Sequence, residues 1–246
     1  MRPTASAWRP RWPGSASFAS AGGEAEVLPY FFGHRDGQRV EIRGADARHL
    51  ARSLRARPGE LISVVQPEGA LLTVRLAAVD ANLVVGLVEE ERPHRPEPEK
   101  EIGLAVAMLP APALDLVLSR GTEAGAAGFS LVAAERSVGR GARPERWASI
   151  CREAAMLSGR LRVPEVVGPV PFSEAWAAAV EPVLLDRSGP ALGPLAGPAT
   201  LFIGPEGGWA PGELELAAGR LASLGPRNLR ADTAALVGLT QALSGQ

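Results

Sequence analysis

The sequence has almost no cysteine, almost no lysine and no long apolar run. Cys151 is the single cysteine among 246 residues, which excludes an internal disulfide and a multi-cysteine metal site. The three histidines, His34, His49 and His94, are too scattered to suggest a metal cluster. No segment approaches the roughly 18 uninterrupted apolar residues of a membrane span. These absences predict a protein of the reducing cytoplasm with no metal and no membrane helix.

Arginine takes the place of lysine almost everywhere, because Lys100 is the only lysine among 26 basic residues. We interpret this bias as the composition of a GC-rich genome, although the planar guanidinium group also suits phosphates and bases. The net charge of −1 hides an uneven distribution, with +4 over residues 1–60, −4 over 61–101 and −1 over 102–246. The total argues against non-specific binding of nucleic acid by the whole surface, but it does not exclude a nucleic-acid partner.

The first hundred residues divide into three segments by composition. Residues 1–26 are rich in Arg, Pro, Ser, Ala and Gly, and are interpreted as either a disordered tail or an over-long, non-native start. Residues 28–90 predict a small β-barrel-like domain with one helix over 46–57, which Asp46 would cap. The strands are expected at 30–32, 39–42, 61–65, 70–76 and 83–88. Residues 91–101, within a run rich in Pro and Glu, predict a solvated connector.

Strands and helices alternate over residues 102–246, which predicts an α/β layer with a mostly parallel sheet. The expected strands lie at 102–109, 129–133, 182–185, 199–203 and 222–225. The expected helices lie at 114–125, 144–157, 211–221 and 232–243. The fold class predicted from the residues is therefore α/β, with a small β domain in front of it.

Two loops carry the chemical information. In Leu201-Phe-Ile-Gly-Pro-Glu-Gly-Gly-Trp209 a buried strand runs into a glycine-rich loop, which is either a tight turn or a ligand loop at a strand end. It matches neither a dinucleotide fingerprint nor a P-loop, and Glu206 would repel an anion, so a ligand with a positive charge or hydrogen-bond donors fits better. The second loop runs from Leu224 to Ala235, and within it Asp232 or Thr233 could cap the last helix.

Together the two loops resemble the signature of the RsmE family, the bacterial 16S ribosomal RNA uracil-N3 methyltransferases of the SPOUT superfamily. The resemblance rests on Ile203-Gly-Pro-Glu-Gly-Gly208 and on Leu224-Gly-Pro-Arg-Asn-Leu-Arg-Ala-Asp-Thr-Ala234, which begins 16 residues past Gly208. Shorter similar segments lie at 121–125, 135–138 and 158–165. The similarity spans roughly residue 28 to the C-terminus.

The resemblance implies a deep trefoil knot in a C-terminal SPOUT-type α/β domain, preceded by a PUA-like RNA-binding barrel. Such a knot would not follow from pattern reasoning, because knots are almost absent from proteins. It also implies a homodimer, S-adenosylmethionine as cofactor, and ribosomal RNA or the small ribosomal subunit as partner. Three loops would hold the cofactor, through Leu184, Leu185, Ile203, Gly204, Pro205, Glu206, Gly207, Gly208, Leu224, Gly225, Leu229 and Thr233.

Methylation of uracil N3 requires loss of the imide proton and stabilisation of the negative charge that develops. We predict that Arg230 stabilises this charge, whereas Asp232 is either a base or a helix cap. Glu206 either orients its loop or faces the sulfonium. RNA contacts are expected from residues of both domains. For each of these residues the alternative is a solvated surface position without a role in RNA binding. These residues are Arg43, His49, Arg52, Arg55, Arg160 and Arg162.

The chain departs from the family pattern at a few positions. Tyr30 and Pro110-Ala-Pro-Ala113 stand where the family has basic or charged segments, Arg120 replaces a lysine, and Met156-Leu157 replaces Glu-Gln. Asp232 stands for the usual glutamate. We expect the first four departures on the RNA side or in the dimer cleft. They leave two alternatives open, namely a non-catalytic ribosome-assembly factor that keeps the knot, and a SPOUT methyltransferase that acts on another RNA site.

Overall fold

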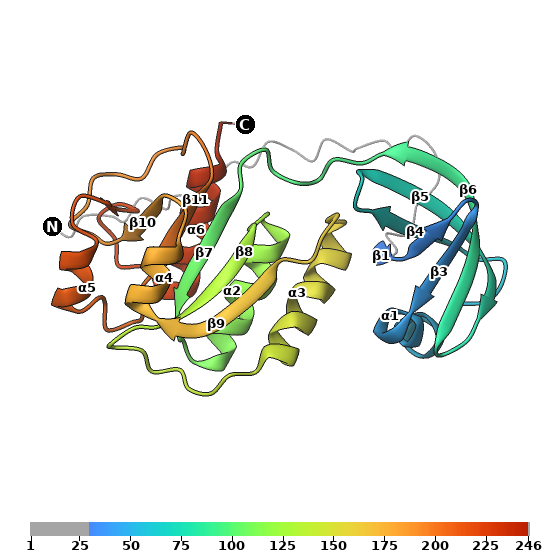
Figure 1. Cartoon of the computed structure of the whole chain (residues 1–246), viewed down its shortest axis with the longest axis horizontal. Helices are drawn as coiled ribbons and strands as arrows, with labels where there is room; N and C mark the ends of the chain where they lie inside the picture. Colours follow the sequence, from blue (N-terminus) through green and yellow to red (C-terminus); the bar gives the residue numbers. More distant parts are fainter. Residues whose placement is uncertain (1–29, 246) are drawn as a thin grey trace, which may run out of the picture.

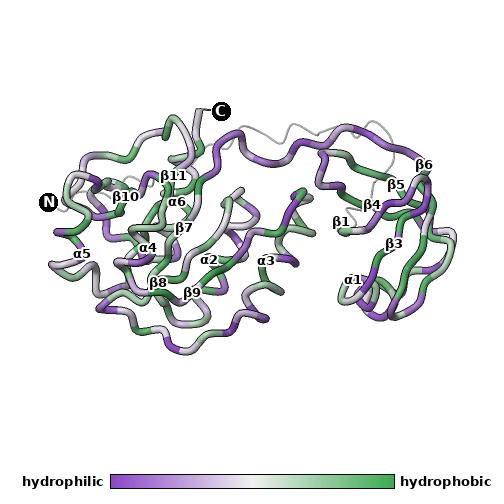
Figure 2. Tube along the Cα trace, viewed as in Figure 1, coloured by the Kyte–Doolittle hydropathy of each residue, from purple (hydrophilic) through white to green (hydrophobic). Residues whose placement is uncertain are grey.

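The computed structural model describes residues 30–245 and divides them into two domains (Figure 1). Residues 30–93, here called the β domain, lie at one end of the molecule, and residues 102–245, the α/β domain, form the rest. A hydrophilic connector, residues 94–101, joins them (Figure 2). The extension predicted over residues 1–26 lies outside the described residues.

The β domain is a curled six-stranded sheet. Its strands lie in the order β1-β4-β5-β6-β3-β2, in which β1 pairs parallel to β4 and all other neighbours are antiparallel. Alternate side chains point inward, so that Val40, Ile42, Leu72 and Val74 form one core with Leu50 from the helical segment. The strands are β1 Tyr30–Phe32, β2 His34–Asp36, β3 Arg39–Arg43, β4 Leu61–Gln66, β5 Ala70–Val79 and β6 Leu83–Pro93.

The helical segment of this domain differs from the predicted helix. It begins as α1, Gly44–Arg48, and continues as a π-helical turn, η1, His49–Leu54. Arg43 occupies the N-cap position and makes no capping hydrogen bond from its side chain, so the prediction that Asp46 caps the helix is wrong. Asp46 instead lies inside α1, almost completely buried, and forms an ion pair with Arg152 of the α/β domain.

The α/β domain contains a six-stranded sheet in which every neighbouring pair is parallel, in the order β12-β10-β11-β7-β8-β9. Helices α2, α3 and α6 pack on one face and α4 and α5 on the other, which buries the sheet as parallel sheets require. The strands are β7 Ile102–Ala107, β8 Gly128–Ala133, β9 Glu165–Pro171, β10 Pro182–Leu185, β11 Ala199–Ile203 and β12 Leu221–Ala222. The helices are α2 Ala111–Glu123, α3 Pro144–Ser158, α4 Phe172–Ala178, α5 Pro211–Leu216 and α6 Ala231–Leu243.

The predicted α/β class is confirmed, although three elements were missed and two were misplaced in addition to the helical segment of the β domain. Strands β2 and β9 and helix α4 were not predicted, and β9 contains two prolines, which count against a strand except at a sheet edge, where β9 lies. Helix α5 ends at Leu216 rather than at 221. The strand expected at 222–225 is the two-residue β12.

The connector is held against the α/β domain and is not simply solvated. Strand β6 extends to Pro93, two residues past the point at which the connector was expected to begin. The carboxylate of Glu97 then accepts hydrogen bonds from Arg160 and from the backbone N–H of Leu161, and Glu101 pairs with Arg162. Glu97 therefore holds the middle of the connector against the α/β domain, and Glu101 holds its carboxyl-terminal end.

The segment between β10 and β11 contacts two parts of the chain that follow it. The backbone N–H of Ser223 donates to Pro190 O, and that of Leu192 donates to Ser223 O. Further along, the backbone N–H of Leu195 donates to Ala242 O near the end of α6. Residues 189–195 therefore lie across both the loop that precedes α6 and the end of α6.

Candidate functional site

A pocket of about 470 Å³ lies where β10, β11 and β12 end. Three loops form it, because the carboxyl ends of parallel strands meet at one edge of the sheet, where ligands of open α/β sheets bind. Its volume lies within the usual range of small-molecule sites. It is lined by Leu185, Asp186, Arg187, Ile203, Gly204, Pro205, Glu206, Gly208, Trp209, Leu224, Gly225, Arg227, Asn228, Leu229, Arg230, Ala231 and Ala234.

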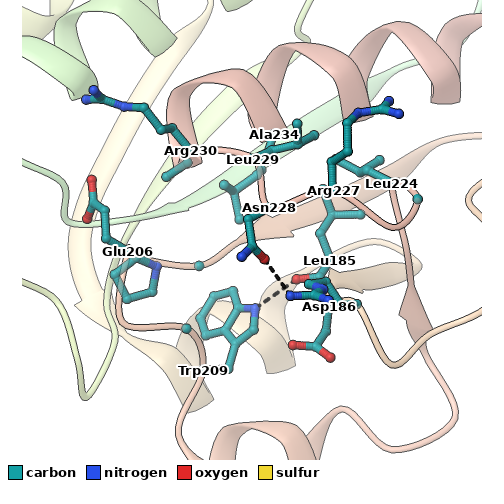
Figure 3. A pocket seen from close by; sticks show the side chains of 17 residues that line it. Leu185, Asp186, Glu206, Trp209, Leu224, Arg227, Asn228, Leu229, Arg230 and Ala234 are labelled. Atoms are coloured by element: carbon teal, nitrogen blue, oxygen red, sulfur yellow. Dashed lines mark hydrogen bonds between the residues drawn. The ribbon is translucent and has the colours of Figure 1, made fainter. Parts of the chain in front are cut away.

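Two side-chain hydrogen bonds tie these loops together (Figure 3). Trp209 donates from Nε1 to the backbone oxygen of Leu185 at 3.2 Å, and Arg187 donates to Oδ1 of Asn228 at 2.6 Å. Gly204 packs directly on the indole, since a Cβ at this position would lie 3.0 Å from the Trp209 ring. The first glycine of the motif is therefore favoured by close packing and not by a positive φ.

The glycine-rich loop is also held from outside the pocket. Buried Glu213, in the first turn of α5, accepts the backbone N–H of Ala210 at 2.7 Å and that of Glu135 at 2.9 Å. Arg136 donates to the backbone oxygen of Gly207 at 3.0 Å. The segment that follows β8 therefore fixes the outer side of the loop, which leaves its inner side to face the pocket.

The pocket combines an apolar interior with charges at its opening. Ile203, Leu224 and Leu229 supply apolar wall, while Glu206 and Arg230 extend to the same side of the opening (Figure 3). The side chain of Arg230 is 75% exposed, and its Nε lies 3.7 Å from Oδ1 of Asp232. Such an arrangement can hold a flat apolar group inside and present a carboxylate and a guanidinium to a second molecule that approaches from outside.

Nine of the twelve residues predicted to hold a cofactor line this pocket, and so does Arg230. Leu184 does not, because its side chain is fully buried in the core under α4 and α5. Gly207 and Thr233 lie outside the lining, although both directly adjoin it in sequence. Asp186, Arg227 and Asn228 lie within the three predicted loops but were not singled out as cofactor residues. The sequence missed Arg187, Trp209, Ala231 and Ala234, which flank those loops.

The start of α6 differs from the prediction. The N-cap position is Arg230, which makes no capping hydrogen bond from its side chain, so neither Asp232 nor Thr233 caps the helix. Asp232 lies in the first turn, where a negative charge is favoured by the helix dipole, and Oδ1 accepts the backbone N–H of Thr233 at 2.7 Å. Asp232 does not line the pocket.

The residues predicted to contact RNA fall into two groups. Arg52, Arg55 and His49 lie exposed on η1 and just after it, and the two arginines make no side-chain hydrogen bond or ion pair within residues 30–245. Arg43 and Arg162 are exposed and already paired, with Glu41 at 2.6 Å and with Glu101 at 3.0 Å. All five are accessible to a polyanion, but Arg43 and Arg162 would first have to release their carboxylate partners.

Arg160 is not accessible to RNA, which corrects its prediction. Its side chain is 4% exposed and forms an ion pair with Glu97, while Nη1 donates to the backbone oxygens of Thr122 and Ala126. It therefore satisfies buried carbonyls and fixes the connector. Nearby Cys151 is fully buried, and burial raises the pKa of its thiol, so the group stays protonated and is no nucleophile.

The departures from the family pattern do not all lie where they were expected. Tyr30 and Met156 lie at the contact between the β domain and α3, where Met156 joins the core of the β domain. Arg120 and Leu157 line a surface groove between α2 and α3, and Leu157 is exposed. Pro110 occupies the N-cap position of α2, and Ala111–Ala113 form its first turn.

Two kinds of site are absent from the part of the chain that the structure describes. Residues 30–245 contain no cluster of three or more His, Cys, Asp or Glu side chains that could hold a metal ion. Within the same residues no helix is both long and apolar enough to cross a membrane.

The family model of the RNA methyltransferase domain matches residues 96–243, which include the whole pocket. The chain belongs to this family. Similar proteins include the ribosomal RNA small subunit methyltransferase E of Synechocystis, which is 30% identical over 82% of this chain and 72% of the relative. The enzyme of the same name from Bacillus subtilis is 27% identical over 81% of this chain and 87% of its own length.

A solved structure supports the same assignment. The ribosomal RNA small subunit methyltransferase E of Neisseria gonorrhoeae, bound to S-adenosyl methionine, is 28% identical and superposes with a TM-score of 0.78 over 87% of this chain and 95% of its own. The predicted family and the predicted fold, a SPOUT-type α/β domain behind a small β domain, are thereby confirmed.

Proposed function

We propose that this protein is an S-adenosylmethionine-dependent methyltransferase that modifies N3 of a uridine in 16S ribosomal RNA. The observation that carries the proposal is the pocket at the ends of β10, β11 and β12, which combines a glycine-rich loop with an arginine at its opening. The named relatives methylate ribosomal RNA of the small subunit, and the Neisseria enzyme binds S-adenosyl methionine. The uracil N3 atom as acceptor rests on the resemblance to the RsmE family.

The residues of the pocket fit this cofactor. Ile203, Leu224 and Leu229 offer apolar surface to an adenine, and the exposed backbone of the three loops offers hydrogen bonds to its edge. Asp186 and Glu206 place carboxylates beside a ligand that carries a sulfonium cation. The cofactor supplies an electrophilic methyl group. Trp209, directly after the two glycines, links its loop to the end of β10 by the hydrogen bond from Nε1 to the backbone oxygen of Leu185.

The chain's own residues would act on the uracil. Arg230, at the opening, would bind the uracil carbonyl oxygens and stabilise the negative charge that develops when N3 loses its proton. Asp232, whose Oδ1 lies 3.7 Å from Nε of Arg230, would take that proton, and Glu206 extends to the same side of the opening as Arg230 (Figure 3). Alignment of the base with the cofactor supplies much of the remaining rate acceleration.

The RNA would contact both domains. Arg52 and Arg55, which are free of ion pairs among the described residues, would bind phosphates, and His49, Arg43 and Arg162 would add contacts around them. We further propose that the chain forms a homodimer and acts in the cytoplasm, where ribosomal subunits are assembled. Light scattering of the purified protein measures the first of these.

Mass spectrometry of 16S ribosomal RNA tests the function. RNA from a strain without this protein should lack one N3-methyluridine, and the purified protein with S-adenosylmethionine should restore it on small subunits or on free RNA. Calorimetry with the cofactor alone separates the alternatives. Absence of binding at millimolar cofactor would favour a non-catalytic assembly factor, and a methyl group on another nucleotide would identify a different RNA site.

A further inference from the structure

Helix α3 belongs to the α/β domain, but its carboxyl-terminal half packs into the β domain. Trp147 and Cys151 lie in the core between the sheet and α2. Met156, little more than one turn further along, is 7% exposed and belongs to the core of the β domain. One helix therefore contributes side chains to both hydrophobic cores.

The ion pair between Arg152 and Asp46 spans this contact. Nε of Arg152 donates to Oδ1 at 2.9 Å and Nη2 donates to Oδ2 at 2.5 Å, which makes the pair bidentate. Asp46 is 3% exposed, and the guanidinium also lies 5.1 Å from the ring centroid of Phe32. The hydrogen bond to Asp46 raises the pKa of Arg152. A bidentate pair fixes direction as well as distance, which a single hydrogen bond does not.

A second set of contacts closes the same junction at the end of α3. Tyr30 stacks on His94 with ring centroids 5.7 Å apart, and Nε2 of His94 lies 2.6 Å from the backbone oxygen of Gly159. Gly159 has φ +68°, and a Cβ on it would lie 2.8 Å from the Tyr30 ring. Only glycine satisfies both the left-handed backbone and the close approach of the ring.

Asp46 stands directly before the exposed basic turn of the β domain. Helix α1, which contains Asp46, continues without a break into η1, on which His49 and Arg52 are exposed, with Arg55 following. Arg152 therefore holds the amino-terminal part of the helical segment, from whose far end Arg52 and Arg55 point outward unpaired. If this amino-terminal part shifted, residues 49–55 would move relative to the pocket.

We propose that the ion pair between Asp46 and Arg152 is a positioning device that fixes the basic turn, residues 49–55, relative to the methyl-transfer pocket. RNA bound by this turn would then present its target base at the pocket opening without a rearrangement of the two domains. The role of RNA here rests on the proposed function. This positioning would act on KM for RNA, because without it the binding of RNA has to supply the free energy that orders the two domains.

The experiment compares variants of this pair with a matched pair on the same helix. Arg146, also on α3, pairs with Asp115 of α2 at 2.6 Å and stays within the α/β domain. The variants are D46N, R152M and the double variant D46N/R152M, and the controls are D115N, R146M and their double. For each we would measure KM for RNA, kcat, the Kd of S-adenosylmethionine, the Tm, and the radius of gyration by small-angle X-ray scattering.

The double variant decides between positioning and simple stability. Replacing both charges leaves no unpaired buried charge, so the Tm should recover most of what either single variant loses. If the pair positions RNA, KM for RNA stays raised in the double variant by about tenfold, a typical size for the coupling of a close pair. The radius of gyration should also rise, while kcat at saturating RNA and the cofactor Kd stay within about twofold.

Three results would overturn the proposal. In the first, KM for RNA recovers together with the Tm in the double variant. In the second, the control variants on Arg146 raise KM equally. In the third, scattering shows unchanged domain positions in R152M. R152K keeps the charge but not the planar fork, so it should fall between wild type and R152M. If wild-type protein methylates no ribosomal RNA, the proposed function fails, and scattering alone still tests whether the pair holds the domains.

Discussion

The pocket and the domain junction are held together in opposite ways. At the pocket, two hydrogen bonds link three loops, one of them between the exposed side chains of Arg187 and Asn228. At the junction, the carboxylates of both ion pairs are little exposed: the side chains of Asp46 and Glu97 are 3% and 15% exposed, and those of their partners Arg152 and Arg160 are 38% and 4% exposed. The loops are left with free backbone groups, whereas the junction satisfies its polar groups internally.

This difference separates two tasks within one chain. Loops that keep unsatisfied groups gain their remaining contacts from a ligand, which makes ligand binding favourable and loop order dependent on it. A junction that is satisfied by itself keeps its geometry whether or not a ligand is present. The comparison predicts that variants of the junction act on stability or on RNA, and that variants of the pocket act on cofactor or rate.

The largest effect is expected from Arg160→Met. The change leaves Glu97 with a buried charge and leaves the carbonyls of Thr122 and Ala126 without their donor. Removing one partner of a buried ion pair costs about 3–5 kcal/mol, so chemical denaturation should show a loss of this size.

Arg162→Met is the matched control, because the neighbouring arginine pairs with Glu101 of the same connector at 60% exposure on both sides. An exposed pair contributes at most about 1 kcal/mol, so this variant should unfold nearly as wild type does. If both variants lost the same free energy of unfolding, the buried pair of Arg160 would contribute no more to stability than the exposed pair of Arg162.

The next largest effect is expected from Arg230→Ala. Its guanidinium is exposed at the opening and joins no buried network, so the Tm and the cofactor Kd should change little. If it stabilises charge on the uracil, kcat should fall about 10²–10³-fold, as when one donor to a developing anion is removed.

Arg220→Ala is the control, because Arg220 is an exposed arginine paired with Glu181 at 2.6 Å outside the pocket. It should leave kcat unchanged. Undiminished turnover of Arg230→Ala would remove this residue from the mechanism, and a comparable loss of cofactor affinity would reassign it to cofactor binding.

The sequence predicted the pocket better than the junction, and the reason is physical. The pocket residues follow one another in short loops at strand ends, so Gly204, Glu206 and Leu229 could be found from local pattern and family resemblance. Even there Trp209 was missed as a pocket residue, although it follows the glycines directly, because its role depends on a hydrogen bond to Leu185 from another strand.

The junction depends on pairs that no local pattern reveals. Asp46 and Arg152 are 106 positions apart, so Asp46 in isolation was interpreted as a helix cap and Arg152 was not singled out. Arg160 was expected at the RNA surface for the same reason, since an arginine in sequence does not show which carboxylate it meets. The expectation of a knot likewise came from resemblance to a family and not from the order of strands.

The smallest effect is expected from Asn228→Ala, which tests the exposed link of the pocket. Its bond to Arg187 joins the loop after β10 to the loop before α6, and both side chains are exposed. Because water competes for such groups, the link should contribute less than about 1 kcal/mol, so the Tm stays unchanged and cofactor Kd rises less than about fivefold. Arg187→Ala should give the same rise, and the double variant should add nothing, since all three remove one bond. If Asn228→Ala weakens cofactor binding while Arg187→Ala does not, Asn228 contacts the cofactor directly. The hydrogen bond between Arg187 and Asn228 then contributes nothing to the order of the pocket loops.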